Sequence, residues 1–204
     1  MNKIVAFDID GVLADFEGRL VDCLVDEFRA LGSMNRSLFS LDERFKNHPE
    51  ILERSLEYVN DPNFYYGLEP IQPTVDFVKN LMERGYWVMY LTSRPRTHEA
   101  FTRRWLEKYT WNYKDSRGLL CGIDDKADFL YDVDVAFLVD DNPKEFTRCK
   151  KRGVNILVWE QPWNEGLFPR LYSDKNGEVM LWGDESKEAL PIFSVISDYE
   201  EVYG

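Results

Sequence analysis

The sequence predicts a doubly wound α/β fold, in which a parallel sheet carries helices on both faces and a small helical cap is inserted after the first strand. Three observations predict it. Residues 3–7 form an apolar run that turns polar at its end, as a buried parallel strand does. From residue 73 to about 160, apolar runs alternate with amphipathic segments, which is typical of a sheet crossed by helices. Residues 33–70, which lie between these parts, show short amphipathic pieces and no strand pattern.

The first helix is expected over residues 16–31. Leu20, Leu24 and Phe28 recur at helical spacing, and Gly32 follows as a C-cap. Residues 33–70 are interpreted as an inserted helical lid. The cap as a whole is predicted to span residues 16–72.

The regular part of the chain begins at Pro73. Helices are expected over residues 74–84, 97–108, 125–131 and 143–152, and strands over residues 86–91, 119–121, 135–139 and 154–159. Residues 1–15 and 73–165 therefore form the predicted α/β core. Residues 166–204 form a C-terminal extension whose structure the pattern leaves open, although Asn176-Gly177 favours a hairpin turn.

Composition limits the partners. The formal net charge is −12, so the chain should repel extended DNA or RNA, whereas a bound cation would still admit a small phosphate ester. No apolar run reaches the ~18 residues of a membrane-spanning helix, and the N-terminal residues lack the layout of a signal peptide. The three cysteines, Cys23, Cys121 and Cys149, match neither a zinc site nor a disulfide framework. We therefore expect reduced thiols and a cytoplasmic location.

Polar residues follow three of the predicted strands. The clusters are Asp8-Ile9-Asp10-Gly11, Thr92-Ser93 and Asp140-Asp141, and Lys126 begins a helix on the same side. Ligands of an open parallel sheet bind at the carboxyl ends of its strands, so these clusters should converge. Two carboxylates buried next to an apolar strand cost desolvation free energy, which favours a functional role for them over a structural one.

These side chains suit metal-assisted phosphoryl transfer. Carboxylates from different strands can hold Mg²⁺, which prefers oxygen ligands. The cation and Lys126 would neutralise a phosphate dianion, to which Thr92 would donate a hydrogen bond. One carboxylate could then attack phosphorus and form an acyl phosphate. Asp10 could protonate the leaving oxygen and later deprotonate water.

The clusters resemble the four ordered motifs of the haloacid dehalogenase superfamily. The matching stretches are Phe7-Asp8-Ile9-Asp10-Gly11-Val12, Leu91-Thr92-Ser93, Lys126, and Val139-Asp140-Asp141-Asn142-Pro143. The resemblance covers residues 3 to about 160 and implies a Rossmann-like core. It assigns the nucleophile to Asp8 and the general acid/base to Asp10, and an aspartate at this second position is the phosphatase pattern of the superfamily.

A narrower resemblance links the chain to the 5'(3')-deoxyribonucleotidases, which place a small helical cap after the first motif. Residues 10–18, 64–81 and 91–96 are similar to that family, whereas residues 33–62 and the tail from about 166 are not. The resemblance implies that Phe16 packs against the base or sugar and that Arg96 is a basic substrate-binding residue. The implied substrate-binding residues are Phe16, Thr92, Ser93, Arg96 and Lys126, and the implied metal ligands are Asp8, Asp10 through its carbonyl, and Asp141, with Asp140 acting indirectly.

The expected function is Mg²⁺-dependent hydrolysis of a small phosphomonoester, a (deoxy)nucleoside monophosphate. One alternative is another phosphatase of the same superfamily that acts on sugar phosphates or on 3'-phosphate ends of nucleic acid. The other is a regulatory module that is phosphorylated on an aspartate without turnover, against which Asp10 argues. The oligomeric state is left open, with a homodimer as the alternative to a monomer.

Overall fold

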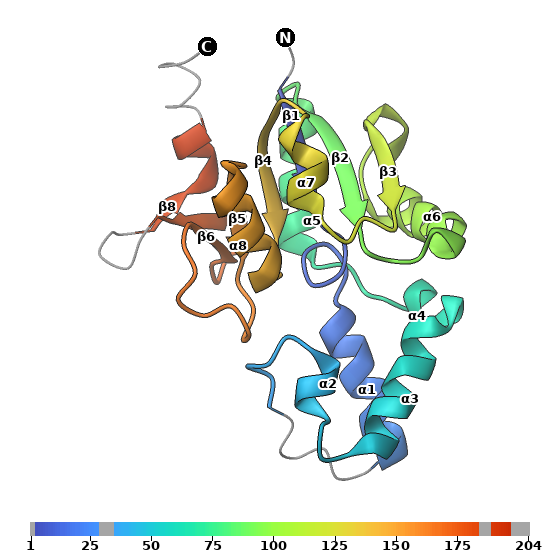
Figure 1. Ribbon diagram of the computed structural model, residues 1–204. Coiled ribbons are helices and arrows are strands. Elements are labelled where there is room, and N and C mark those ends of the chain that lie inside the picture. The colour runs from blue at the N-terminus through green and yellow to red at the C-terminus, as the bar shows by residue number, and fades with distance from the viewer. Residues whose placement is uncertain (1–2, 29–34, 184–188, 197–204) are drawn as a thin grey trace.

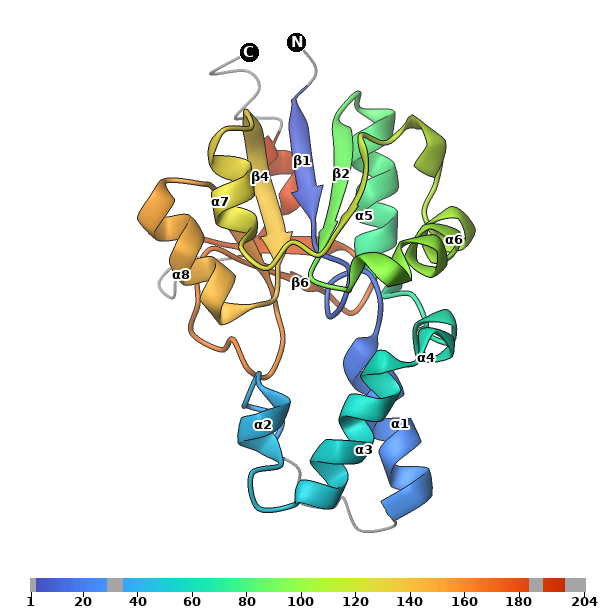
Figure 2. The same ribbon diagram turned by 45° about the vertical axis from the view of Figure 1, so that its right-hand side comes forward.

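The computed structural model describes residues 3–28, 35–183 and 189–196. Within them the strands form one sheet in the order β3-β2-β1-β4-β5-β6-β7-β8 (Figures 1 and 2). Neighbouring strands from β3 to β6 are parallel, and the β6-β7 and β7-β8 pairs are antiparallel. The strands are β1 (Ile4–Phe7), β2 (Trp87–Thr92), β3 (Gly118–Cys121), β4 (Val135–Asp140), β5 (Ile156–Trp159), β6 (Arg170–Ser173), β7 (Val179–Trp182) and β8 (Leu190–Pro191). The predicted α/β class is confirmed.

Helices cover both faces of the sheet (Figure 2). One face carries α5 (Gln72–Glu83) and α6 (Glu99–Tyr109), and the other carries α7 (Lys126–Tyr131) and α8 (Pro143–Arg152). Successive residues of a strand point to opposite faces. Val5 and Phe7 therefore join the core of the α5 face, while Ala6 joins that of the α7 and α8 face. Two short 3₁₀ helices, Arg96–His98 and Tyr113–Asp115, flank α6.

The segment predicted as the cap is helical and lies beyond the carboxyl ends of the strands (Figure 1). It contains α1 (Phe16–Phe28), α2 (Leu41–Arg44), α3 (Pro49–Asn60) and α4 (Pro62–Tyr66). Helix α1 begins at Phe16 because Asp15 caps it, with Oδ1 accepting a hydrogen bond from Gly18 N at 2.8 Å. The expected end of this helix at residue 31 and its C-cap at Gly32 lie outside the described residues.

The chain enters and leaves this helical segment through two adjacent stretches. Asp15 N donates a hydrogen bond to Glu69 O at 2.9 Å, and Ile71 N donates to Leu13 O at 2.8 Å. Paired backbone groups of this kind satisfy each other and fix the path of both stretches. The chain therefore passes between the sheet and the cap segment at this pair of stretches, called the hinge below, next to the carboxyl end of β1.

The C-terminal extension continues the sheet. Strands β6 and β7 form the hairpin that Asn176-Gly177 favours, with Gly177 at φ +83° and Asp174 N donating to Glu178 O. Residues 192–196 are helical, and Phe193 packs edge-on against Phe77 of α5 with ring centroids 5.4 Å apart. This part therefore covers the sheet face that α5 also covers.

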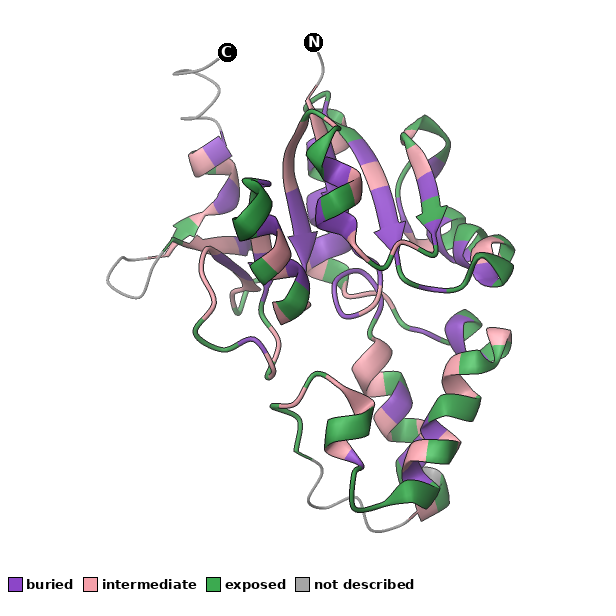
Figure 3. Ribbon diagram, in the orientation of Figure 1, coloured by how far each residue is buried: buried purple, intermediate pink, exposed green. Residues whose placement is uncertain are grey.

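Burial follows these layers. The central strands are buried along most of their length, whereas the cap helices alternate buried and exposed positions (Figure 3). From residue 73 to 159, the observed helices and strands of the sheet layers lie within two residues of the predicted ones. Of the residues that the structure describes, none belongs to a helix with the length and apolar character needed to cross a membrane.

Candidate active site

Side-chain alternation along two central strands brings three charged groups together at the carboxyl edge. Asp8 lies on the same face as Ala6 of β1, and Asp140 lies on the same face as Leu138 of β4. Helix α7 covers that face and begins with Lys126. Lys126 Nζ lies 2.8 Å from Asp8 Oδ1 and 2.7 Å from Asp140 Oδ2, and its side chain is 5% exposed. The lysine therefore faces the acidic cluster and not the solvent.

Gly11 allows the loop after β1 to approach Asp141. Its φ is +77°, a conformation that favours glycine, and Gly11 N donates to Ala14 O at 2.9 Å to close a tight turn. A Cβ at this position would overlap the Asp141 carboxylate. Gly11 therefore has two roles: it allows the tight turn, and it allows the loop to contact Asp141 of the fourth motif.

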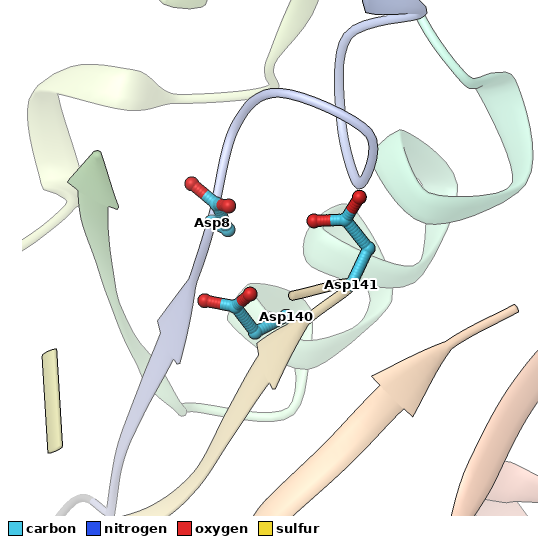
Figure 4. A group of neighbouring side chains, drawn as sticks. All are labelled: Asp8, Asp140 and Asp141. Atoms are coloured by element: carbon cyan, nitrogen blue, oxygen red, sulfur yellow. The ribbon is translucent and has the colours of Figure 1, made fainter. Parts of the chain in front are cut away.

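Asp8, Asp140 and Asp141 each offer a carboxylate oxygen within 4.8 Å of the others, and all three are buried (Figure 4). Burial raises the pKa of Asp8 to about 7, with Lys126 opposing this effect and Asp140 adding to it. Burial and the charges of Asp8 and Asp140 raise the pKa of Asp141 well above its usual range.

These carboxylates fit a divalent cation. Lys126 pairs with Asp8 and Asp140, so the three buried carboxylates together carry surplus negative charge, which is costly unless a cation offsets it. All donors in the cluster are oxygens, which suits Mg²⁺. Burial alone would lower the pKa of Lys126, but Asp140 and Asp8 together raise it. The lysine therefore stays protonated beside the cluster and can face a phosphate.

A buried glutamate fixes the start of helix α7. Glu145 Oε2 accepts hydrogen bonds from Lys126 N at 3.0 Å and from Ala127 N at 3.2 Å. Glu145 belongs to α8 and is 1% exposed. These bonds satisfy backbone donors that a helix start leaves without partners, and they hold Lys126 in place beside the aspartates.

Asp10 makes a side-on pair with an arginine that the sequence reading did not select. Arg94 Nε donates to Asp10 Oδ2 at 2.8 Å, and Arg94 Nη2 donates to Asp10 Oδ1 at 2.6 Å. Arg94 comes two residues after the end of β2 and is 2% exposed. The Asp10 side chain keeps 24% of its surface exposed. Its carboxylate is thus held in one orientation while it still reaches the cavity described next.

A cavity of about 410 Å³ lies between these residues and the cap, within the ~300–1,000 Å³ range of small-molecule sites. Asp8, Asp10, Lys126 and Asp141 are among its lining residues on the sheet side. The cap contributes apolar and aromatic side chains: Phe16, Leu56, Val59 and Tyr65. Phe16 packs edge-on against Phe64, with ring centroids 5.3 Å apart. The predicted residue Phe16 therefore lines the cavity and also packs within the cap.

The other predicted substrate-binding residues differ in placement. Ser93 lines the cavity. Thr92 is 1% exposed, and its hydroxyl accepts a hydrogen bond from Arg94 N at 3.1 Å. Arg96 is exposed, is not among the residues that line the cavity, and packs its side chain near Gly122. Arg94, and not Arg96, is therefore the arginine of the Leu91–Arg96 stretch that the structure brings to the cavity.

A second set of lining residues joins the loop after β5 to the cap. Trp163, in the loop after β5, lies with its ring 6.1 Å from that of Phe39, and the Arg44 guanidinium lies 5.3 Å from the same indole ring. Arg44 Nη1 also pairs with Glu17 Oε2 of α1 at 2.6 Å. Trp163 Nε1 donates to Asp141 O at 3.2 Å. The loop thus connects the cluster of Asp8, Asp140 and Asp141 to the cap segment.

Sequence reasoning missed Arg94 and the contacts of Trp163 for different reasons. Arg94 stands inside the stretch that carried the resemblance, and the choice of Arg96 over it rested on the family alone. Residues 159–164 lie outside the four motifs, and because 150 positions separate Gln161 from Gly11, no spacing signals that Gln161 Nε2 donates to Gly11 O at 2.7 Å. An unusual density of tryptophan, Trp159 and Trp163, was the available signal.

Residues 2–176 match the sequence family described as 5' nucleotidase, deoxy (pyrimidine), cytosolic type C. A protein of Oceanobacillus iheyensis, described as a presumed nucleotidase, is 28% identical over 144 residues, which cover 69% of this chain and 72% of that protein. The human mitochondrial 5'(3')-deoxyribonucleotidase is 29% identical over 115 residues. That match covers 52% of this chain and about half (48%) of the human protein.

Solved structures agree on the fold. A haloacid dehalogenase-like hydrolase from Streptococcus pneumoniae superposes with a TM-score of 0.55 at 15% identity, covering 78% of this chain and 85% of that one. CbbY from Rhodobacter sphaeroides, solved in complex with phosphate, superposes with a TM-score of 0.52 at 15% identity, covering 83% and 93% of the two chains. At this level of identity the likeness establishes the α/β core and leaves the substrate open.

Proposed function

The chain belongs to the 5' nucleotidase, deoxy (pyrimidine), cytosolic type C family, and from that membership we propose that it hydrolyses (deoxy)nucleoside monophosphates with Mg²⁺ through an aspartyl-phosphate on Asp8. It is a phosphoric monoester hydrolase with a haloacid dehalogenase-type core. The observation that carries the finer proposal is the group of Asp8, Asp141 and Lys126 on the wall of one cavity that aromatic cap residues also line.

The first half-reaction transfers the phosphoryl group to Asp8. A carboxylate oxygen of Asp8 forms a bond to phosphorus as the ester P–O bond breaks. Lys126, 2.8 Å from Asp8 Oδ1, supplies positive charge beside the transferring group. The leaving nucleoside oxygen takes a proton from Asp10.

The second half-reaction returns the enzyme to its starting state. Asp10 accepts a proton from water as the water oxygen attacks phosphorus, and the bond between phosphorus and Asp8 breaks to release inorganic phosphate. Asp10 then carries the proton that the next substrate needs. The two carboxylates thus take separate tasks although only Ile9 separates them.

Asp8, Asp141 and the Asp10 carbonyl would hold the Mg²⁺, in line with the buried oxygen cluster. When bound, the cation offsets the negative charge of the cluster and of the phosphoryl oxygens. Asp140 would help indirectly, because its carboxylate accepts hydrogen bonds from Lys126 Nζ and from Asn142 N. It thereby orients the lysine and the turn that carries Asp141.

The cap favours a leaving group with an apolar, planar part. Phe16, Tyr65, Phe39 and Trp163 all line the cavity, and aromatic rings stack on nucleobases with ~1–3 kcal/mol per base in single-strand binders. A sugar phosphate offers no such face. The family description names deoxy pyrimidine substrates, and we propose that deoxynucleotides are preferred.

The proposal is tested by measuring phosphate release from a metabolite panel in Mg²⁺, with Asp8→Asn protein purified in parallel as the control for contaminating phosphatase. We expect catalytic turnover with nucleoside monophosphates above that with hexose phosphates at equal concentration. A clear preference for a hexose phosphate would favour the sugar-phosphatase alternative. Release of a single equivalent of phosphate would favour the regulatory module.

The proposal also covers the cellular location, the partner and the oligomeric state of the protein. The family description includes the words cytosolic type, which supports the cytoplasmic location expected from the cysteines, while the human relative is described as mitochondrial. The partner is a small phosphomonoester, and extended nucleic acid is disfavoured by the net charge of −12. A homodimer stays a prediction, which light scattering of the purified protein would check.

A further inference from the structure

Arg94 has no part in the reaction as described above, although it lines the same cavity. Three polar contacts hold its guanidinium: Nε and Nη2 donate to the two oxygens of Asp10, and Nη1 donates to Thr102 Oγ1 at 3.2 Å. Thr102 is itself anchored, because its hydroxyl donates to His98 O at 3.0 Å. The arginine is therefore a fixed support on the core side of the cavity.

The contact with Asp10 constrains geometry as well as charge. A guanidinium that donates two parallel hydrogen bonds to the two oxygens of a carboxylate defines the plane in which that carboxylate lies. A lysine has a single charged nitrogen and cannot define this plane. The Asp10 side chain is otherwise open to the cavity, with 24% of its surface exposed, so the arginine accounts for its orientation.

The cap takes part in the same arrangement. The Arg94 guanidinium lies 4.4 Å from the centre of the Tyr65 ring of α4, in cation–π geometry. Tyr65 is 3% exposed, and its hydroxyl donates to Val59 O of α3 at 2.9 Å. The cap helices α3 and α4 therefore set the position of the ring against which the guanidinium packs.

We propose that Arg94 is a positioning residue for the general acid: it holds the Asp10 carboxylate toward the leaving oxygen and makes that orientation depend on the contact between the cap residue Tyr65 and the core. This inference rests on the proposed function, since it needs Asp10 to act as the acid. The role does not require Arg94 to touch the substrate, because three of its five N–H groups already donate to the protein acceptors that fix it beside Asp10. Substitution of Arg94 should therefore slow substrates whose leaving oxygen needs a proton more than substrates whose leaving oxygen does not.

The test compares two substrates that differ in this demand. The alkoxide of a nucleotide leaves only when it is protonated, whereas the phenolate of p-nitrophenyl phosphate leaves without help. Arg94→Lys keeps the charge and loses the side-on pair. We expect kcat/KM for the nucleotide to fall about 10- to 100-fold, which does not exceed the ~10²–10⁴-fold that a general acid contributes. The value of kcat/KM for p-nitrophenyl phosphate should stay within about threefold. The comparison uses kcat/KM, which reports the steps up to phosphoryl transfer to Asp8, because Asp10 also acts as the base in the later hydrolysis of the aspartyl-phosphate, a step that is the same for both substrates.

A double-mutant cycle separates action through Asp10 from any other role. If Arg94 acts through Asp10, Asp10→Asn/Arg94→Lys should be no slower on the nucleotide than Asp10→Asn alone, because the two changes remove the same function. Arg103→Lys is the matched control: this arginine pairs with Glu99 on the exposed side of α6 and should give wild-type rates. Circular dichroism and thermal melting check the fold of each variant.

The results with the two substrates and with the double-mutant cycle distinguish a positioning role of Arg94 from other roles. Equal losses of kcat/KM on both substrates, or additive losses in the cycle, would show a phosphate-binding or general structural role and overturn the positioning role while the proposed function stands. If Arg94→Lys does not fold, Thr102→Val takes its place: Thr102 is not among the residues that line the cavity, and the change removes the acceptor of Arg94 Nη1. It should lower kcat/KM for the nucleotide more than for p-nitrophenyl phosphate. A wild-type protein that turns over neither substrate would overturn both proposals.

Discussion

Neighbouring carboxylates of this site differ because their surroundings differ. Asp8 is 8% exposed and faces Lys126, whereas Asp10 has a partly exposed side chain and faces Arg94. Only Asp8 belongs to the buried cluster that fits a cation. A carboxylate beside a cation and a lysine suits attack on phosphorus, and one at the cavity wall suits proton transfer.

Asp8→Asn should leave the fold intact and lower phosphate release ~10³-fold or more, because the amide is nearly isosteric and cannot form the acyl phosphate. Initial rates with a nucleotide and Mg²⁺ measure the loss, and circular dichroism checks the fold. Retention of more than about a tenth of the wild-type rate would contradict the assignment, since losing a nucleophile typically costs far more.

The cysteines give a pH-dependent prediction. Burial raises the pKa of Cys121 to about 11 and that of Cys149 to about 12, and the reactive form of cysteine is the thiolate. Below these pKa values the thiol form dominates, so the thiolate fraction of either residue stays at or below ~1% up to pH 9. Iodoacetamide should therefore label half-buried Cys23 in the native protein and reach the other two only after unfolding. Rapid native-state labelling of Cys121 or Cys149, read by mass spectrometry, would oppose this.

At the scale of elements, the cavity exists because two separate segments meet the sheet edge. Helix α1 starts at the hinge and presents Phe16 to the cavity, whereas the loop after β5 carries Trp163 to its other side. The two walls are linked through the pair of Glu17 and Arg44, whose guanidinium lies over the Trp163 ring. A cap held at both sides can exclude water from the reacting groups.

Phe16→Ala should lower kcat/KM for nucleotides about 5- to 150-fold, which corresponds to the ~1–3 kcal/mol of a stacked base. The loss with p-nitrophenyl phosphate should be much smaller, because Asp8 and Lys126 are untouched. Phe28→Ala is the matched control: Phe28 is the last described residue of the same helix, is partly buried, and is not among the residues that line the cavity. It should lower stability and leave the ratio between the two substrates unchanged. Equal losses for both substrates in Phe16→Ala would show that Phe16 only packs the cap.

At the scale of the molecule, the three buried carboxylates repel one another, and a bound cation would reduce this repulsion. Asp8, Asp140 and Asp141 gather at the carboxyl ends of β1 and β4, in the middle of the sheet, where the surrounding layers exclude water. Under the proposed function, their charges favour the binding of a cation at the expense of the stability of the metal-free protein. Stability and metal binding should therefore be coupled.

Mg²⁺ at about 100 times its dissociation constant should stabilise the fold by ~2.7 kcal/mol, or about 5–10 °C in Tm for a chain of this size. EDTA should reverse the shift, and a sodium salt of equal ionic strength is the control. Asp141→Asn should remove the shift and raise the Tm of the metal-free protein, because it deletes a buried charge beside two others. A Tm that is unaffected by Mg²⁺ in the wild type would contradict the proposed metal site.

The polar clusters at the strand ends were predictable, because buried parallel strands are continuous in apolar residues and turn polar where they end. Apolar runs that end in Asp8, Thr92 and Asp140 mark the carboxyl edge of a parallel sheet, and the structure places these ends side by side. The contacts of Lys126 with Asp8 and Asp140 follow from side-chain alternation once the face of α7 is known. Arg94 and Trp163 were not predictable in this way, because neither stands in a periodic element.

The sequence by itself determined the α/β class, the succession of helices and strands along the chain from residue 73 to 159, and the three strand ends that carry Asp8, Thr92 and Asp140, because these depend on local periodicity of 2 and 3.6 residues. Only the tertiary structure decided that β6 and β7 extend the sheet, that Arg94 and not Arg96 reaches the cavity, and that Trp163 joins the cap to the loop after β5. Contacts of this kind join residues that are distant in the chain. They depend on side-chain direction and loop path, which short-range patterns do not encode.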